Sequence, residues 1–190
     1  KNEGTGILPS RKWKLGYIGE PWFKGDTINM GIGQGYITAT PLQIALAYSA
    51  LANKGELVQP RIIEKIGEED TKIVIKKNIS LNDDKNWKRI EKSLLGVVEA
   101  KNGTANNIYD KNIRIAGKTG TAQVKSIIET EYELLRVDKS LRDHALFVGY
   151  GPIEEPKLVV VAIIENGESG SAVAAPLVRS AINLYSNNEK

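Results

Sequence analysis

The chain has 190 residues, of which 41% are hydrophobic and 26% are charged, and its formal charge is +3. This length fits one domain or a large part of one, and the composition is that of a globular protein, which excludes collagen-like and disordered chains. The weak positive charge gives no indication of a nucleic-acid partner, because acidic and basic residues are interspersed. We expect no nucleic-acid binding.

Missing residue types narrow the possible chemistry. The chain has no cysteine, which excludes disulfides, cysteine-zinc sites and a cysteine nucleophile. His144 is the single histidine, so a site with several histidine ligands is excluded. The longest apolar stretches, 44–52 and 158–164, fall short of the roughly 20 residues of a membrane span. The first residues resemble neither a signal peptide nor a translation start, so we expect a piece of a longer protein.

In the first half of the chain, the sequence predicts loops followed by one buried helix. Residues 1–35 are rich in Gly, Pro and Trp and show no sustained period, which predicts loops with short turns. Thr40 is a plausible N-cap and Pro41 suits the first helical position of a helix that ends near Gly55. That helix is apolar nearly all round, which predicts burial. Residues 57–66 then read as extended, with 73–75 as a possible pairing partner.

The second half predicts an antiparallel sheet between helices. A turn at 82–84 precedes a helix with apolar residues at helical spacing up to Val98. Strands are predicted in 113–123, 145–150 and 158–164, with the last two forming a hairpin and the last covered on both faces. A charged loop occupies 124–143. The final helix is predicted in 172–185; its expected buried face consists of Val173, Leu177, Ala181 and Leu184. The fold class is therefore α+β, with an antiparallel sheet flanked by helices.

The segment Gly117-Lys118-Thr119-Gly120-Thr121 combines a cation, hydroxyls and glycines in strand-like sequence. Glycines allow close approach to the backbone, and a lysine beside a threonine hydroxyl can bind a carboxylate. Backbone N–H groups of an edge strand can bind an extended peptide or stabilise an oxyanion. The alternative interpretation, a solvated lysine on an ordinary strand with a glycine bulge, stays open on these residues alone.

The sequence does not match two nucleotide-binding motifs, and its histidine is better explained by a structural role than by a catalytic one. A Walker A loop would need glycine at Asn112, and a dinucleotide loop starting at Gly31 would need glycine at Tyr36. We therefore expect no cofactor, and the acidic residues of 124–143 show no metal-like regularity. His144 precedes an apolar strand and is interpreted as a structural residue at the strand end, because a catalytic histidine needs a positioned partner.

Several short motifs nevertheless occur in one order along nearly the whole chain. They are Gly4-Thr5-Gly6-Ile7-Leu8-Pro9-Ser10, Trp13-Lys14, Gly33-Gln34-Gly35-Tyr36, Ala39-Thr40-Pro41-Leu42-Gln43, Gly103-Thr104-Ala105, Ala116-Gly117-Lys118-Thr119-Gly120-Thr121-Ala122-Gln123, His144-Ala145-Leu146-Phe147-Val148-Gly149-Tyr150 and Ala174-Ala175-Pro176. Together they resemble the C-terminal part of a penicillin-binding protein transpeptidase domain. Within that family the chain is most similar to the monofunctional class B enzymes of the elongation type, known as penicillin-binding protein 2.

The resemblance implies the fold shared by penicillin-binding proteins and serine β-lactamases. It implies a D,D-transpeptidase that cross-links peptidoglycan stem peptides during cell-wall elongation and is acylated by β-lactams. Such an enzyme faces the periplasm or the outer side of the cytoplasmic membrane, held there by an N-terminal anchor. Its implied partners are stem peptides, β-lactams, scaffold proteins of the elongation complex and a membrane glycosyltransferase, with no cofactor and no metal.

The family's third motif, Lys-Thr-Gly, maps onto Lys118, Thr119 and Gly120. By resemblance, Lys118 and Thr119 hold the carboxylate of substrate or drug, and Lys118 also contacts the serine of the second motif. The backbone N–H of Thr121 forms half of the oxyanion hole. We therefore expect Lys118 and Thr121 as catalytic residues and Thr119 and Gly120 as substrate-binding residues.

The first two motifs depart from the family pattern. No serine of the chain begins a Ser-x-x-Lys sequence, so the nucleophile and its activating lysine are missing. Ser80-Leu81-Asn82 and Ser186-Asn187-Asn188 match the second motif, Ser-x-Asn, but both lie outside its expected place in the order. We therefore expect residues 1–190 to be the C-terminal portion of a single transpeptidase domain. The N-terminal portion, with the nucleophile, lies outside this chain, and the chain alone is expected to be inactive.

Two other functional classes remain open. The chain could be a non-catalytic peptidoglycan-binding or scaffold domain that kept the fold, or a relative of the β-lactamases and β-lactam sensors. An upstream Ser-x-x-Lys would separate an enzyme from a binding module. Persistence of the acyl-enzyme would separate a transpeptidase from a β-lactamase. The motifs at 33–36 and 39–41 favour the transpeptidase.

Overall fold

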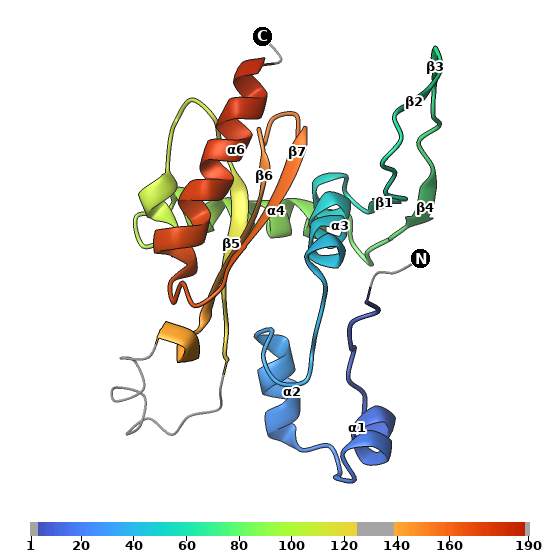
Figure 1. Ribbon diagram of the computed structural model, residues 1–190, viewed down its shortest axis with the longest axis vertical. Helices are drawn as coiled ribbons and strands as arrows, with labels where there is room; N and C mark the ends of the chain where they lie inside the picture. Colours follow the sequence, from blue (N-terminus) through green and yellow to red (C-terminus); the bar gives the residue numbers. More distant parts are fainter. Residues whose placement is uncertain (1–3, 125–138, 189–190) are drawn as a thin grey trace. The chain divides into compact units, whose positions relative to one another are not determined.

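The computed structural model describes residues 4–124 and 139–188 (Figure 1). The chain divides into two compact units, Lys1–Gln43 and Ile44–Lys190, and each is described by itself. Most of the charged loop predicted at 124–143 lies outside the described residues.

The first unit contains two short helices where only loops were predicted: α1 (Arg11–Tyr17) and α2 (Lys24–Gly31). The side chain of Ser10 caps α1 by accepting a hydrogen bond from the Trp13 N–H at 3.1 Å. Asp26 accepts one from the Phe23 N–H at 2.7 Å at the start of α2. Side-chain caps fix these helix starts, so helices form without the apolar period on which the loop prediction relied.

The first unit contains a buried lysine. Lys14 is only 2% exposed and its Nζ lies 2.8 Å from Asp26 Oδ2, with the Phe23 ring centroid at 4.7 Å. The hydrogen bond to Asp26 raises the pKa of Lys14, and the same bond lowers the pKa of Asp26. Lys14 is therefore held charged by its carboxylate partner.

Helix α3 (Pro41–Ala52) begins where the sequence predicted. Thr40 Oγ1 accepts from the Gln43 N–H at 3.1 Å, and Gln43 Oε1 accepts from the Thr40 N–H at 2.9 Å, which forms a capping box. The predicted burial is wrong, however. Only Ala50 of this helix is buried, and Leu42 is 42% exposed. Most of its other side chains are partly exposed, so the described residues cover α3 incompletely.

An extended hairpin follows α3 and confirms the predicted pairing. Its strands are β1 (Glu56–Val58), β2 (Lys65–Ile66), β3 (Glu69–Asp70) and β4 (Ile75–Asn78). β1 pairs with β4, with Val58 opposite Ile75 and an irregularity at Leu57/Val58, and β2 pairs with β3.

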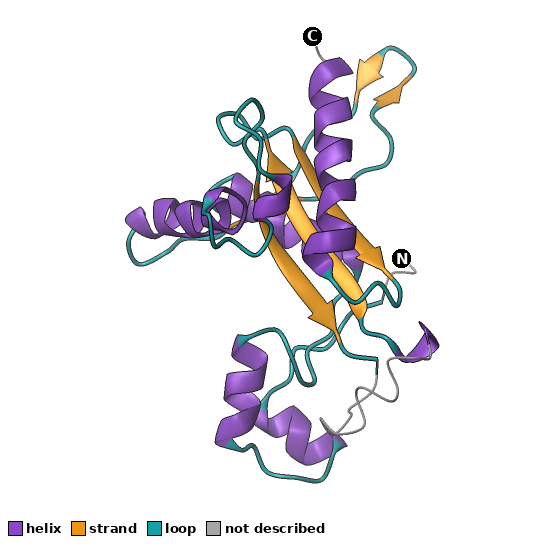
Figure 2. Ribbon diagram, turned by 90° about the vertical axis from the view of Figure 1, so that its left-hand side faces the viewer, coloured by secondary structure: helices purple, strands orange, loops and turns teal. Residues whose placement is uncertain are grey.

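The main sheet of the second unit has three antiparallel strands in the order β5-β6-β7 (Figure 2). They are β5 (Ala116–Ala122), β6 (His144–Gly151) and β7 (Leu158–Ile164). The predicted β6–β7 hairpin and the α+β class with an antiparallel sheet are confirmed. The central strand β6 is almost wholly buried, whereas β7 is half exposed, with Ile163 at 38%. The prediction that 158–164 is covered on both faces is therefore wrong for the described residues, since none of the seven side chains of β7 is buried.

Helices lie on both faces of this sheet. α4 (Lys85–Glu99), found as predicted, and the short turn η1 (Asn106–Ile108) precede β5, and η2 (Lys139–Leu141) precedes β6. A π-helical turn, η3 (Gly170–Ala174), leads into α6 (Ala175–Asn188), which covers one face. The core on that side consists of Val98, Ala105, Ile108, Ile115, Ala145, Phe147, Ala174, Ala175, Val178 and Ile182. The opposite face buries Ala116, Tyr150 and Ile153, and burial raises the pKa of Tyr150 to about 12.

The predicted buried face of the last helix is wrong. α6 buries Ala175, Val178 and Ile182, whereas Leu177 and Leu184 are 52% and 65% exposed. This helix carries two apolar stripes, so its sequence period could not decide which stripe packs on the sheet. No described helix combines the length and apolarity needed to cross a membrane.

Candidate active-site strand

The four predicted site residues lie together on β5. This strand pairs with β6 through Lys118–Val148, Thr119–Phe147, Gly120–Leu146 and Thr121–Ala145. Among the described residues β5 has no strand neighbour on its other side, so it forms an edge of the sheet. Successive side chains of a strand point to opposite faces of the sheet. Lys118 therefore points to the face that carries Ala116 and Tyr150, whereas Thr119 and Thr121 point to the other face. The segment therefore presents a cation and hydroxyls beside one accessible backbone edge.

Lys118 and the glycines shape this edge. The Lys118 side chain is exposed, and its Nζ donates to the Thr119 carbonyl oxygen at 2.9 Å, so the ammonium lies against the strand. A Cβ on Gly117 would meet the Val148 carbonyl oxygen at 2.7 Å, which explains the need for glycine there. A Cβ on Gly120 would meet only the Leu146 side chain, at 3.0 Å. The absence of a Cβ at Gly120 thus lets the Leu146 side chain lie close to the strand.

A threonine outside the predicted set contacts the strand. Thr104 Oγ1 lies 3.1 Å from Thr119 Oγ1, within hydrogen-bond distance. Thr104 belongs to the turn before η1, which is anchored to α4 by the Ala105 N–H donating to the Val97 carbonyl at 2.9 Å. In the sequence, the 103–105 triplet contributes only to the family resemblance and indicates no role for Thr104. Its separation of 15 residues from Thr119 gives no local signal of contact.

The turn η3 packs directly against the same part of β5. Gly170 is buried, and a Cβ on it would lie 2.8 Å from the Gly120 carbonyl oxygen and would also clash with the Leu146 carbonyl oxygen. This close approach requires glycine at position 170. The backbone of η3 therefore supports Gly120 from one side of the strand.

His144 has a structural role, as predicted. Its Nδ1 accepts a hydrogen bond from the Asn166 N–H at 2.9 Å. Asn166 has a positive φ of 56° and donates from its side chain to the Arg142 carbonyl at 2.8 Å. His144 thus fixes the turn after β7 to the start of β6.

Neither serine of the two Ser-x-Asn matches lies near the predicted site residues among the described parts of the chain. Ser80 follows the exposed strand β4 and Ser186 lies in the last turn of α6, so neither chance Ser-x-Asn match lies on β5 or its neighbours. Across residues 4–124 and 139–188, no group of three or more His, Asp or Glu could hold a metal ion. The described part of β5 thus presents a lysine ammonium and threonine hydroxyls, with neither of these serines beside them.

Comparison with known proteins gives a match over almost the entire chain. The family described as the penicillin-binding protein transpeptidase domain matches residues 1–183. The peptidoglycan D,D-transpeptidase MrdA of Haemophilus influenzae is 41% identical over 98% of this chain, and that of Escherichia coli K12 is 36% identical over 90%. The chain spans only 30% and 28% of the lengths of these relatives.

Solved structures agree with the sequence relatives. Pseudomonas aeruginosa PBP2 in complex with WCK 5153 superposes with a TM-score of 0.80 at 38% identity, covering 96% of this chain and 38% of that one. The complex of PBP2 with MreC from Helicobacter pylori gives a TM-score of 0.77 at 32% identity, covering 100% of this chain and 32% of that one. These likenesses confirm the predicted transpeptidase fold.

Proposed function

The chain belongs to the penicillin-binding protein transpeptidase family, and we propose that it forms the Lys-Thr-Gly wall of a serine D,D-transpeptidase active site. The whole enzyme cross-links peptidoglycan stem peptides during cell-wall elongation and is acylated by β-lactams. The observation that carries this proposal is the exposed Lys118 beside Thr119 and Gly120 on a sheet edge. The names of the relatives, peptidoglycan D,D-transpeptidase and PBP2, support the reaction and the elongation type.

Each residue of the wall has a role in acyl transfer. Lys118 and Thr119 bind the carboxylate of the stem peptide or of a β-lactam, because a charge-assisted hydrogen bond from an ammonium is among the stronger polar contacts. Gly120 lets the acyl group lie close to the strand. The Thr121 N–H donates to the oxyanion that forms when the serine attacks the carbonyl. Lys118 and Thr121 therefore act as catalytic residues, and Thr119 and Gly120 bind substrate.

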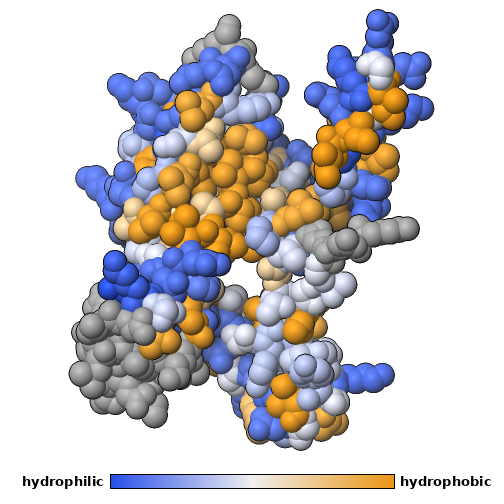
Figure 3. Space-filling view, in the orientation of Figure 1, coloured by the Kyte–Doolittle hydropathy of each residue, from blue (hydrophilic) through white to orange (hydrophobic). Residues whose placement is uncertain are grey.

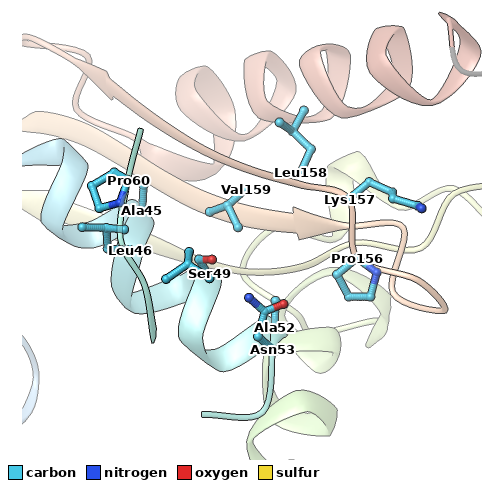
Figure 4. Close-up of a pocket in the computed structure, with 11 residues that line it drawn as sticks. Ala45, Leu46, Ser49, Ala52, Asn53, Pro60, Pro156, Lys157, Leu158 and Val159 are labelled. Carbon is cyan, nitrogen blue, oxygen red and sulfur yellow. The ribbon is translucent and has the colours of Figure 1, made fainter. Parts of the chain in front are cut away.

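The nucleophile is supplied by an N-terminal portion of the same domain, outside residues 1–190. The chain contains no Ser-x-x-Lys sequence, and it spans only 30% of the length of the Haemophilus influenzae relative. Both observations support this assignment. Uncovered apolar surface supports it as well. Apolar side chains gather over α6 and β7 (Figure 3), and a cavity of about 320 Å³ lies between α3 and β7 (Figure 4). Leu46, Val58 and Val159 are among its lining residues. We assign this surface to contact with the rest of the domain.

The same relatives support a proposal for location and assembly. A PBP2 has been solved in complex with MreC, and another relative within a peptidoglycan synthase complex. We propose that the protein containing this chain likewise joins elongation-complex scaffolds and a membrane glycosyltransferase. It lies in the periplasm or on the outer face of the cytoplasmic membrane, anchored by an N-terminal segment.

The test is the rate of acylation of the intact protein by benzylpenicillin. Lys118→Ala and Thr119→Ala should each lower the second-order rate, about 10- to 100-fold for Lys118, since a hydrogen bond to a charged group contributes about 1.5–3 kcal/mol. Lys92→Ala, which removes an exposed lysine from α4, is the matched control and should leave the rate unchanged. Wild-type rates in both strand variants would overturn the assigned roles.

The fate of the adduct separates the alternatives. A transpeptidase retains the benzylpenicilloyl group for a long time, whereas a β-lactamase hydrolyses it and turns over. An intact protein that binds peptidoglycan but never becomes acylated would support the non-catalytic binding domain instead.

A further inference from the structure

We propose that Thr104 is a positioning residue that orients the hydroxyl of Thr119 toward the ligand carboxylate. This inference rests on the proposed function, because it concerns the same site. It starts from the 3.1 Å contact between the two Oγ1 atoms. Thr104 is exposed and Thr119 is half-buried, so the pair lies where a ligand can reach it.

The proton count of the pair sets the direction of the hydrogen bond. A threonine hydroxyl has one proton to donate and two lone pairs with which to accept. If Thr119 donates to a carboxylate, the bond between the two threonines must use the proton of Thr104. Thr104 then donates to Thr119, and Thr119 donates to the ligand. Without Thr104, the Thr119 hydroxyl can rotate freely, and its proton is no longer aimed at the carboxylate.

Thr104 can perform this role because its turn is held firmly. A Cβ on Gly103 would lie 2.5 Å from the Val97 carbonyl oxygen, so the turn packs on α4 at backbone distance. Asn106 Nδ2 donates to the Val98 carbonyl at 2.9 Å, and Ala105 is fully buried. These contacts fix the backbone on both sides of Thr104.

The same turn is joined to η3, which supports the next residue of the strand. Asn107 Nδ2 donates to the Ser171 carbonyl at 2.8 Å, and the neighbouring Gly170 packs on the Gly120 backbone. The turn at 103–108 and η3 are thus linked to each other and contact β5 at adjacent residues. We call this pair of turns the brace of β5. It holds the Thr119 side chain and the Gly120 backbone in one fixed geometry.

The experiment compares two variants of Thr104 in the intact protein. Thr104→Val keeps the side-chain volume and removes the hydroxyl, and Thr104→Ser keeps the hydroxyl. We expect Thr104→Val to lower the acylation rate by benzylpenicillin about 2- to 10-fold, the range of one neutral hydrogen bond. Thr104→Ser should restore the rate to within about twofold. Ser93→Ala, which removes an exposed hydroxyl from α4, is the matched control.

Two further readouts separate positioning from a merely structural effect. In a Thr119→Ala background, Thr104→Val should cause no additional loss, because its effect passes through Thr119. Acylation by the methyl ester of benzylpenicillin, which lacks the free carboxylate, should be equally fast in wild type and Thr104→Val. A loss with the ester as large as with the free acid would overturn the proposal. The proposal would also be overturned if wild type and Thr104→Val were acylated by benzylpenicillin at equal rates while Thr119→Ala was acylated more slowly. If Thr119→Ala and Lys118→Ala are also unimpaired, the proposed function itself fails.

Discussion

The two edge strands of the sheet, β5 and β7, differ in composition, support and accessibility. β5 consists of Gly, Ala, Lys and Thr, presents a charged side chain, and is braced by two turns. β7 consists of Leu, Val, Ala and Ile, contains no charge or proline, and is half exposed along its whole length. Edge strands of native proteins usually carry devices that prevent further pairing. β7 has none of them among its seven residues.

This difference indicates different uses for the two edges. The small and polar residues of β5 suit a strand whose edge is approached by a ligand. The β-branched residues of β7 suit a strand that pairs with another strand of the same protein. We therefore expect the ligand at β5 and the N-terminal portion of the domain at β7.

The largest expected effect concerns amide hydrogen exchange in the intact protein. Amides of β7 should be protected about 10³-fold or more throughout the strand, because pairing on both sides ties them to global unfolding. Amides of β5 should exchange faster and become slower after acylation by benzylpenicillin. The buried strand β6 provides the reference for full protection. Rapid exchange at alternate residues of β7 would show that no strand pairs with its outer edge.

The next effect tests the brace of β5. Gly170→Ala should destabilise the protein by about 3 kcal/mol, because the new methyl group would overlap backbone oxygens that cannot move away easily. Gly96→Ala is the matched control: Gly96 lies within α4 with open space around its Cα. That substitution should stabilise by about 0.5–1 kcal/mol. Denaturant unfolding measures both, and equal stability of the two variants would show that η3 does not support the strand.

Gly120→Val tests the ligand side of β5 directly. The added side chain meets the flexible Leu146 side chain rather than backbone, so the stability cost should stay near 1 kcal/mol. The acylation rate should fall about 100-fold, because displaced reacting groups lose productive geometry. A variant that loses stability but keeps its acylation rate would place the ligand elsewhere.

The smallest expected effect concerns the pH dependence of stability and comes from β6, the strand between the two edges. Burial raises the pKa of Tyr150 to about 12 from its ordinary value of 10. The unfolded tyrosine therefore ionises first, and stability is lost as the pH rises from 10 to 12. At pH 11 the loss is about 1.4 kcal/mol. Tyr150→Phe should remove this alkaline component. An unchanged alkaline limb in that variant would mean that Tyr150 is not responsible.

The sequence predicted the elements whose signals are local. The N-cap at Thr40, the amphipathic helix α4 and the three strands of the main sheet were all found near the predicted positions. The strand that carries the four proposed site residues was also predicted, because Lys118 to Thr121 are contiguous and share one element.

The wrong predictions concern burial, and the missed residues make long-range contacts; both depend on tertiary packing. The apolar stripe that α6 buries could not be chosen from its period, because Leu177 and Val178 head two equally apolar stripes. The burial of α3 and β7 was overestimated, since a hydrophobic run does not reveal whether its cover belongs to the same stretch of chain. The roles of Thr104 and Gly170 were missed because their contacts with β5 join residues 15 or more positions apart.

The most direct test locates the drug in the intact protein. The protein is incubated with excess benzylpenicillin and digested, and mass spectrometry identifies the peptide that gains one drug mass. We expect an adduct on a serine that begins a Ser-x-x-Lys sequence outside residues 1–190. An adduct on any serine within residues 1–190, including Ser80 or Ser186, would contradict this expectation.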